Sequence, residues 1–206
     1  MIKISILDIS RFDNNQIDNF VEALPFGSSE KDRLLGIKSK SRYKASAAAL
    51  MVLSLIVEKD TPMTIERTNL GKPFFPDAPY LKFSLSHADS LAIAALDDSG
   101  NDIGIDVEFI RENLDTSKIA TRFFGNADMS HDEFFTLWTK KEAYSKMLGT
   151  PLAPNLKKTP EEGVFKQFRI TLNGKCGYIC LCSRKLEKTK KVSILRRPAG
   201  MLIEEI

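Results

Sequence analysis

The sequence has few of the residues on which disulfide frameworks and zinc sites depend. Among its 206 residues there are three cysteines, two histidines and one tryptophan. A closed zinc site takes four ligands, and the histidines lie far in sequence from Cys176, Cys180 and Cys182. A chain with no secretion signal is not expected to build a disulfide framework either. Strand periodicity would put the three cysteines on one face with Tyr178, and we predict that they act as small apolar core residues.

Long hydrophobic runs are also missing. The longest, residues 47–57, is interrupted only by Ser54 and is shorter than the roughly 18 residues that a membrane helix requires. Residues 2–8 alternate between polar and apolar side chains, as in a strand, and lack the apolar centre and cleavage site of a signal peptide. We therefore expect a cytoplasmic protein without a membrane partner.

The charge is nearly balanced but unevenly distributed. There are 30 basic and 27 acidic residues, and 43% of the chain is hydrophobic, a composition that argues against a disordered chain or a coiled coil. Residues 31–44 hold six basic residues and one acid, and residues 183–198 hold seven and one. Each cluster fits a solvated surface, an anionic ligand, an acidic protein or nucleic acid. No nucleic-acid partner is expected, because the clusters lack interleaved aromatics and a recognition motif.

Helices precede strands in both halves of the chain. We predict an α+β fold of two similar halves, residues 1–110 and 111–206, each a helix region followed by antiparallel strands. The Asn173-Gly174 pair predicts a hairpin in the second half. The expected helices are 28–57, ended by Thr61-Pro62, then 116–124 and 130–148. The expected strands are 2–8, 63–67, an antiparallel meander of 81–86, 91–96 and 103–108, then 165–172, 176–182 and 192–195.

Two acidic residues lie on the third strand of the predicted meander. Asp106 and Glu108 alternate with the apolar residues of Ile103-Gly104-Ile105-Asp106-Val107-Glu108, so both carboxylates would face the same way. Such a pair offers oxygen ligands to a hard cation such as Mg²⁺. A solvated strand face would show the same pattern.

The helix at 130–148 carries further candidates. Ser130 with Glu133 forms a capping-box signal, and Gly149 is placed to end the helix. Glu142 and Lys146 are four residues apart and lie on one line of the helix with Trp138. They fit either an exposed ion pair or the wall of a cleft.

Ser86 and His87 follow each other at the end of a predicted strand. Neighbouring strand residues point to opposite faces, which argues against a serine nucleophile activated by this histidine. His87 could instead donate to a phosphate or cap a turn. Lys72 stands in a stiff loop, Gly71-Lys72-Pro73.

Taken in order, these motifs resemble the Sfp-type 4′-phosphopantetheinyl transferases. The resemblance covers about residues 71–149. It rests on Gly71-Lys72-Pro73, Phe83-Ser84-Leu85-Ser86-His87, Gly104-Ile105-Asp106-Val107-Glu108 and Trp138-x-x-Lys141-Glu142-Ala143-x-x-Lys146-x-x-Gly149. It implies a pseudo-duplicated, monomeric enzyme with coenzyme A in the cleft between its halves.

The resemblance also implies roles for individual residues. Asp106, Glu108 and Glu142 would hold Mg²⁺, with Glu142 as the general base and Lys146 neutralising charge on the pyrophosphate. The remaining coenzyme A contacts would come from Ser86, His87, Lys72, Pro73, Arg42 and, as a looser match, Lys31. The expected activity is Mg²⁺-dependent transfer of 4′-phosphopantetheine from coenzyme A to a serine of an apo acyl or peptidyl carrier protein, releasing adenosine 3′,5′-bisphosphate. The alternative is a non-catalytic relative that binds coenzyme A or a carrier protein.

Overall fold

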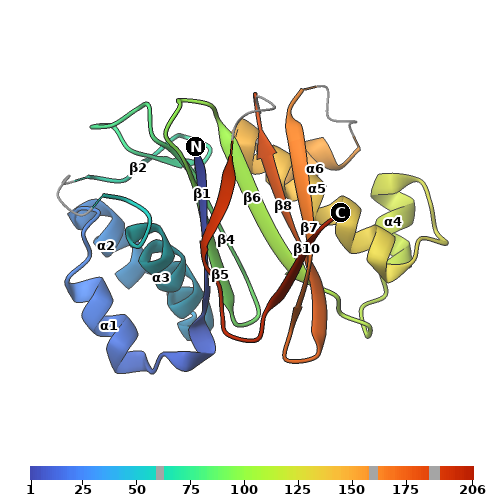
Figure 1. The fold of residues 1–206 in the computed structure, drawn as a ribbon, viewed down its shortest axis with the longest axis horizontal. Helices are drawn as coiled ribbons and strands as arrows, with labels where there is room; N and C mark the ends of the chain where they lie inside the picture. Colours follow the sequence, from blue (N-terminus) through green and yellow to red (C-terminus); the bar gives the residue numbers. More distant parts are fainter. Residues whose placement is uncertain (59–62, 158–161, 186–190) are drawn as a thin grey trace.

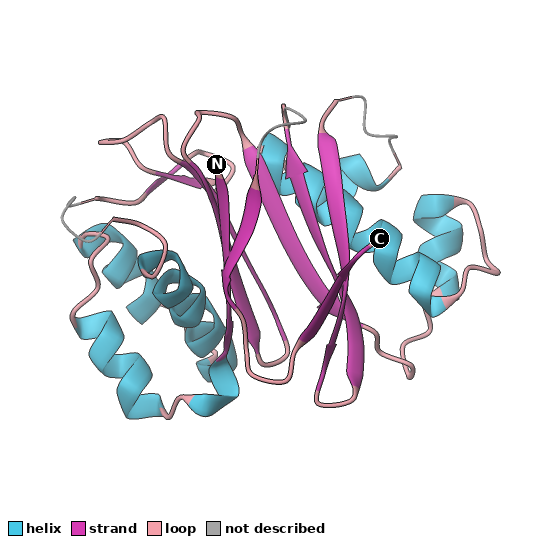
Figure 2. Ribbon diagram, in the orientation of Figure 1, coloured by secondary structure: helices cyan, strands magenta, loops and turns pink. Residues whose placement is uncertain are grey.

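The protein is built in four layers, helices, sheet, sheet and helices (Figure 1, Figure 2). The computed structural model describes residues 1–58, 63–157, 162–185 and 191–206. The predicted helix end at Thr61-Pro62 and part of the second basic cluster lie outside these residues. The mixed architecture confirms the predicted α+β class.

The first sheet has the strand order β4-β5-β1-β9. Its strands are β1 (Ile2–Asp8), β4 (Lys82–Ala88), β5 (Leu91–Asp97) and β9 (Val192–Arg196). β5 is buried along its whole length and lies between β4 and β1, antiparallel to both. β9 pairs with β1 in the parallel sense, so the expectation of purely antiparallel strands is wrong at this edge.

The second sheet has the strand order β10-β7-β8-β6. Its strands are β6 (Ile103–Phe109), β7 (Val164–Leu172), β8 (Lys175–Ser183) and β10 (Leu202–Glu205). Asn173 and Gly174 join β7 to β8 with φ values of 51° and 77°, which confirms the predicted hairpin, since tight hairpin turns need positive φ.

β6 does not complete the predicted meander. It pairs antiparallel with β8, far along the chain, while β4 pairs with β5 alone in the described ladders. β4 and β6 still meet, because the Ser84 hydroxyl accepts the backbone N–H of Ile105 at 3.0 Å. The local turn signal at residues 97–100 could not reveal this, since strand pairing is decided by non-local packing.

Helices of the first half cover the outer face of the first sheet. They are the short 3-10 helix η1 (Ile9–Arg11), α1 (Asn14–Glu22), α2 (Ser28–Leu35) and α3 (Lys40–Ser54). The single helix expected over 28–57 is therefore wrong. The N–H of Gly36 closes α2 on the carbonyl of Asp32, and Ser39 caps a new helix through the N–H of Arg42. A serine N-cap favours a fresh start of this kind.

Helices of the second half cover the outer face of the second sheet. They are α4 (Ser117–Phe124), α5 (His131–Leu148) and α6 (Leu152–Leu156). The predicted caps of α5 are confirmed: Ser130 and Glu133 form the capping box, and Gly149 ends the helix at φ 69°. A small hairpin, β2 (Glu66–Arg67) with β3 (Pro73–Phe74), carries the loop that contains Lys72.

The core between the sheets follows from strand alternation. In each of β1, β5, β6, β7 and β8, every second residue packs there, and Ile4, Ile93 and Ile105 are examples. The opposite faces pack against helices. Cys180 and Cys182 pack against α5 with Ala143 and Met147, which confirms the core prediction for these two cysteines. Cys176 is only partly buried and lies outside the core, so the prediction is wrong for this residue.

The boundary at residue 110 stays a prediction. Two strands pair with the sheet of the other half: β6 precedes residue 110 but belongs to the second sheet, and β9 follows it but belongs to the first. Within the described ranges, no helix is both long and apolar enough to span a membrane.

Candidate active site

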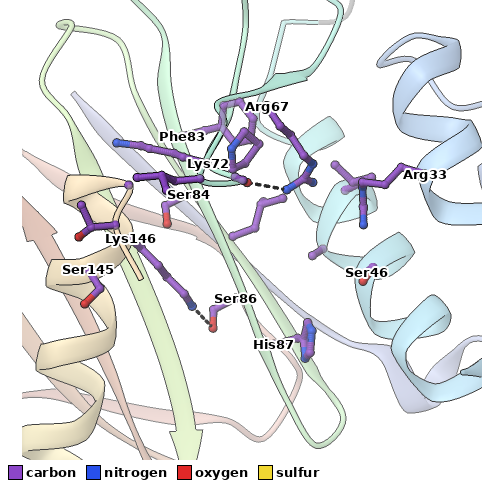
Figure 3. A pocket seen from close by; sticks show the side chains of 18 residues that line it. Arg33, Ser46, Arg67, Lys72, Phe83, Ser84, Ser86, His87, Ser145 and Lys146 are labelled. Atoms are coloured by element: carbon purple, nitrogen blue, oxygen red, sulfur yellow. Dashed lines mark hydrogen bonds between the residues drawn. The ribbon is translucent and has the colours of Figure 1, made fainter. Parts of the chain in front are cut away.

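A cavity of about 320 Å³ lies where the two halves meet (Figure 3). α2 and α3 line one side, and β4 with the C-terminal end of α5 lines the other. The Gly71-Lys72-Pro73 loop borders it as well. The predicted contacts Lys72, Pro73, Ser86, His87 and Lys146 are all among its lining residues.

Three side chains bond to one another at one side of the cavity. Asp106 is 4% exposed, and its Oδ1 accepts from the Lys146 ammonium at 2.7 Å and from the Ser86 hydroxyl at 2.8 Å. Lys146 also donates to the Ser86 oxygen at 2.8 Å. The cluster joins β4, β6 and α5, so it ties the two sheets and the long helix together at the pocket.

Strand alternation explains the directions of these side chains. Ser86 is buried and His87 exposed, which confirms that neighbours on this strand point to opposite faces. Asp106 lies opposite Cys180, and Glu108 lies opposite Tyr178. These β8 residues pack toward the helix side of the sheet, and both carboxylates share that face.

The three predicted metal ligands influence one another electrostatically. Burial, with the charges of Asp106 and Glu142, raises the pKa of Glu108 to about 7, although Arg111, whose Nη2 lies 3.0 Å from Glu108 Oε2, lowers it. Burial and the Asp106 charge also raise the pKa of Glu142, against the opposing effect of Lys146. Neighbouring carboxylates that disfavour each other's charge offer a place for a cation.

One observation favours a metal ion at these carboxylates, and another observation opposes it. Oδ2 of Asp106 is buried without a hydrogen-bond partner, and such an orphan atom is costly unless something binds it. However, no group of three His, Cys, Asp or Glu in the described parts of the chain lies in an arrangement that could hold an ion. Lys146 provides the positive charge beside Asp106 in this structure.

A glycine brings α5 close to β6. A Cβ on Gly104 would lie 1.9 Å from the carbonyl oxygen of Ala143 and 2.5 Å from the backbone N of Met147. Only a residue without a side chain permits this approach. Because Glu142 and Lys146 are next to these two helix positions, Gly104 sets their distance from Asp106.

Lys72 fixes the loop that borders the cavity. Its ammonium donates to the Met147 carbonyl at 2.5 Å and to Asp102 Oδ1 at 3.2 Å. Its side chain passes over Gly149, where a Cβ would lie 2.7 Å from the lysine Cδ. Lys72 therefore bonds a free carbonyl at the end of α5, a place that favours cations.

Two predicted contacts are not among the lining residues of this cavity. Lys31 forms an ion pair with Glu22 at 2.7 Å. Arg42 is exposed in the first turn of α3, one turn before Ser46, which does line the cavity. Partial desolvation of the His87 ring by its neighbours lowers its pKa, and the charges of Lys146 and Arg42 lower it further while Asp106 opposes them. Arg42 thus influences the pKa of His87, a lining residue of the cavity, through its charge, although Arg42 does not line the cavity itself.

Sequence reasoning missed two other cations. Arg33 and Arg67 line the cavity, and both pair with Glu30, which is 2% exposed. Arg33 is at the i+3 position from Glu30, a spacing that signals a helical pair, but Arg67 comes from a distant hairpin. Trp138 does not line the cavity; it stacks on Phe134 with 5.7 Å between ring centroids.

Arg33, Arg67, Lys72 and Lys146 line the pocket, and a pocket lined by cations suits an anionic ligand. A family model of the 4′-phosphopantetheinyl transferase superfamily matches residues 102–191. That range includes β6, α5 and β8, with Asp106, Glu142 and Lys146.

The chain is also similar to curated proteins that are named 4′-phosphopantetheinyl transferases. The chain is 38% identical over 96 residues to the 4′-phosphopantetheinyl transferase HetI of Nostoc sp., covering 40% of each chain. It is 33% identical over 93 residues to a 4′-phosphopantetheinyl transferase of Bacillus subtilis, again 40% of each. It is 26% identical over 156 residues to the 4′-phosphopantetheinyl transferase ffp of Bacillus subtilis, covering 63% of this chain and 68% of the relative.

The first two alignments span only 40% of the length of those relatives. Over the aligned part of the chain, the comparisons confirm the resemblance predicted from the motifs: the chain is similar to the Sfp-type 4′-phosphopantetheinyl transferases.

Proposed function

We propose that the protein transfers the 4′-phosphopantetheine group of coenzyme A to a serine of an apo acyl or peptidyl carrier protein, as a monomer that requires Mg²⁺. The observation that carries the proposal is the cluster of Asp106, Lys146 and Ser86 at the pocket between the halves. The relatives support the same class, because they are named 4′-phosphopantetheinyl transferases.

Asp106, Glu108 and Glu142 are the residues that would hold Mg²⁺. Magnesium favours a few carboxylates together with water and phosphate oxygens, and the unpartnered Oδ2 of Asp106 supports this donor set. When bound, the ion would act as a Lewis acid that stabilises charge on the phosphate oxygens.

Lys146 and Ser86 would bind and orient the pyrophosphate. Lys146 is only partly buried, with 29% of its side chain exposed, so its ammonium can exchange Asp106 for a ligand oxygen without crossing an apolar region. The Ser86 hydroxyl can donate either to Asp106, as it does here, or to a phosphate. These contacts neutralise the charge that develops on the leaving phosphate.

Glu142 is the proposed base. The serine oxygen of the carrier forms a bond to the β-phosphorus of coenzyme A, and the bond from that phosphorus to the bridging oxygen breaks. Adenosine 3′,5′-bisphosphate leaves with the bridging oxygen, and Glu142 takes the serine proton. The raised pKa of Glu142 suits this task, because a carboxylate with a pKa nearer neutrality is a stronger base.

The proposal is tested by incubating the protein with coenzyme A, Mg²⁺ and apo carrier proteins from fatty-acid, polyketide and peptide synthesis. The expected result is a mass gain of one phosphopantetheine on at least one carrier, matched by release of adenosine 3′,5′-bisphosphate. Binding of coenzyme A without product on any carrier would contradict transfer and favour the non-catalytic alternative.

A further inference from the structure

Glu30 is a charged side chain in the interior of the first half. It lies on α2, and only 2% of its surface is exposed. A buried carboxylate is costly unless it is paired and hydrogen-bonded. Glu30 is paired twice, so its burial depends on two arginines.

The two arginines come from different elements. Arg67, on β2, donates through Nη2 to Oε1 of Glu30 at 2.7 Å and through Nε to Oε2 at 3.2 Å. Arg33, one turn after Glu30 on α2, donates through Nε to Oε1 at 2.9 Å. Burial raises the pKa of Glu30, but the hydrogen bonds and charges of Arg67 and Arg33 lower it further than burial raises it. The carboxylate is therefore ionised at neutral pH.

Both guanidinium groups reach the candidate active-site cavity. Arg33 and Arg67 are among its 18 lining residues, and none of these described residues is acidic. Figure 3 shows the two arginines across the cavity from Lys146 and Ser86. A guanidinium has five N–H donors, and the bonds to Glu30 leave donors on both side chains for a ligand.

A further bond extends this unit to the loop that borders the cavity. Arg67 donates through Nη1 to the carbonyl of Gly71 at 3.0 Å. The next residue is Lys72, which holds the end of α5 through Met147. Glu30 thus fixes Arg67, and Arg67 in turn holds the loop against α2.

We propose that Glu30 is a positioning residue for ligand binding: it holds Arg33 and Arg67 as a paired site for a phosphate monoester, across the cavity from Lys146. Two fixed guanidinium groups match a doubly charged phosphate, which accepts several charge-assisted hydrogen bonds. The inference rests on the proposed function, because coenzyme A carries a phosphate monoester as well as a pyrophosphate.

Positioning and simple charge attraction predict opposite effects at Glu30. Removing a negative charge beside a cationic pocket should tighten the binding of any anion. Removing the group that orients the arginines should weaken it, because mobile side chains must be ordered when the ligand binds. Glu30→Gln keeps the size of the side chain and removes its charge.

The experiment is a calorimetric titration of the wild-type protein and Glu30→Gln with coenzyme A and with dephospho-coenzyme A, which keeps the pyrophosphate and lacks the monoester. We expect Glu30→Gln to bind coenzyme A about tenfold more weakly and to bind dephospho-coenzyme A as the wild type does. Glu205→Gln is the matched control: it removes an equal charge from an exposed pair with Lys166 and should leave both affinities within about twofold.

Three outcomes would overturn the proposal. Unchanged or tighter binding of coenzyme A by Glu30→Gln would show that charge alone matters, and an equal loss for both ligands would show a general structural defect. Failure of the wild-type protein to bind either ligand would contradict the proposed function and the inference together.

A second variant covers the case in which Glu30→Gln does not fold. Arg67→Lys keeps the positive charge but cannot bind Glu30 and Gly71 with a planar fork. We expect it to lose affinity for coenzyme A and not for the dephosphorylated form. Equal affinities of Arg67→Lys and wild type for coenzyme A would contradict the paired site.

Discussion

The ammonium of Lys146 lies 2.7 Å from Oδ1 of Asp106, which joins the long helix α5 to strand β6 at the pocket. The residues are 40 positions apart, and the Ser86 hydroxyl bonds both. The second oxygen of Asp106 is buried without a partner. One carboxylate thus presents an oxygen neutralised by a lysine and an oxygen without a partner, and under the proposed function a metal ion and a phosphate would replace the lysine.

Asp106 should be required for transfer. We expect Asp106→Ala to lower kcat by at least about a hundredfold, because it removes the central proposed metal ligand, and added Mg²⁺ should not restore the rate. The melting temperature should change little in comparison, since Lys146 remains partly exposed to water. Steady-state rates across a Mg²⁺ titration measure this. Glu205→Gln, which loses an exposed pair with Lys166, is the control, and a variant as active as this control would refute the assignment.

Arg42 should affect binding more than chemistry. It is exposed at the start of α3, and its charge reaches His87 at the pocket mouth. Arg42→Ala should raise the KM for coenzyme A by about three- to tenfold with kcat nearly unchanged, and added salt should shrink the difference. Lys38→Ala removes an equal charge from the same basic segment and should have a smaller effect. A fall in kcat at unchanged KM would contradict this role.

Gly104 should be intolerant of any side chain. The Cβ of Gly104→Ala would meet the Ala143 carbonyl at 1.9 Å, so α5 must move away from β6. We expect a loss of about 2 kcal/mol or more in the free energy of unfolding, measured by denaturant titration, and lower transfer activity in the folded fraction. Gly36→Ala is the control, because its Cβ would make only ordinary 3.5 Å contacts. Equal stability of the two variants would show that the close approach is not constrained.

Glu108 should make the stability of the metal-free protein depend on pH. Its pKa is raised from 4.5 to about 7, mainly by burial and by Asp106. The folded protein therefore holds this proton more tightly than the unfolded chain does, and the stabilisation is complete below about pH 4.5 and is lost as the pH rises to about 7.

The Glu108→Gln variant isolates this effect, because glutamine does not titrate. The melting temperature of the wild type, measured relative to Glu108→Gln in the presence of a chelator, should fall as the pH rises through that window. A difference between the two proteins that stays constant with pH would show that Glu108 has an ordinary pKa.

Local sequence signals predicted the elements that carry the site. The capping box of Ser130 with Glu133 and the stop at Gly149 defined α5 almost to the residue, since caps depend on neighbours in sequence. Strand alternation likewise separated Ser86 from His87 and placed Asp106 and Glu108 on one face. The cluster of Asp106, Lys146 and Ser86 then required only that β4, β6 and α5 meet.

Contacts between residues far apart in the sequence could not be predicted from the sequence alone. Nothing near Arg67 signals its partner Glu30, because the bond joins residues 37 positions apart. The pairing of β6 with β8 could not be predicted for the same reason. The helical composition of residues 28–57 favoured one long helix, but the N-cap at Ser39 starts a separate helix, α3. Pairings of this kind depend on packing across the whole molecule.

The most direct test of the central claim is the intact mass of an apo carrier protein after incubation with coenzyme A, Mg²⁺ and either the wild-type protein or Asp106→Ala. We predict that the wild type adds one phosphopantetheine to the carrier serine and that Asp106→Ala adds none in the same time. An unmodified carrier with the wild-type protein, across carriers from all three pathways, or equal modification by both proteins, would contradict it.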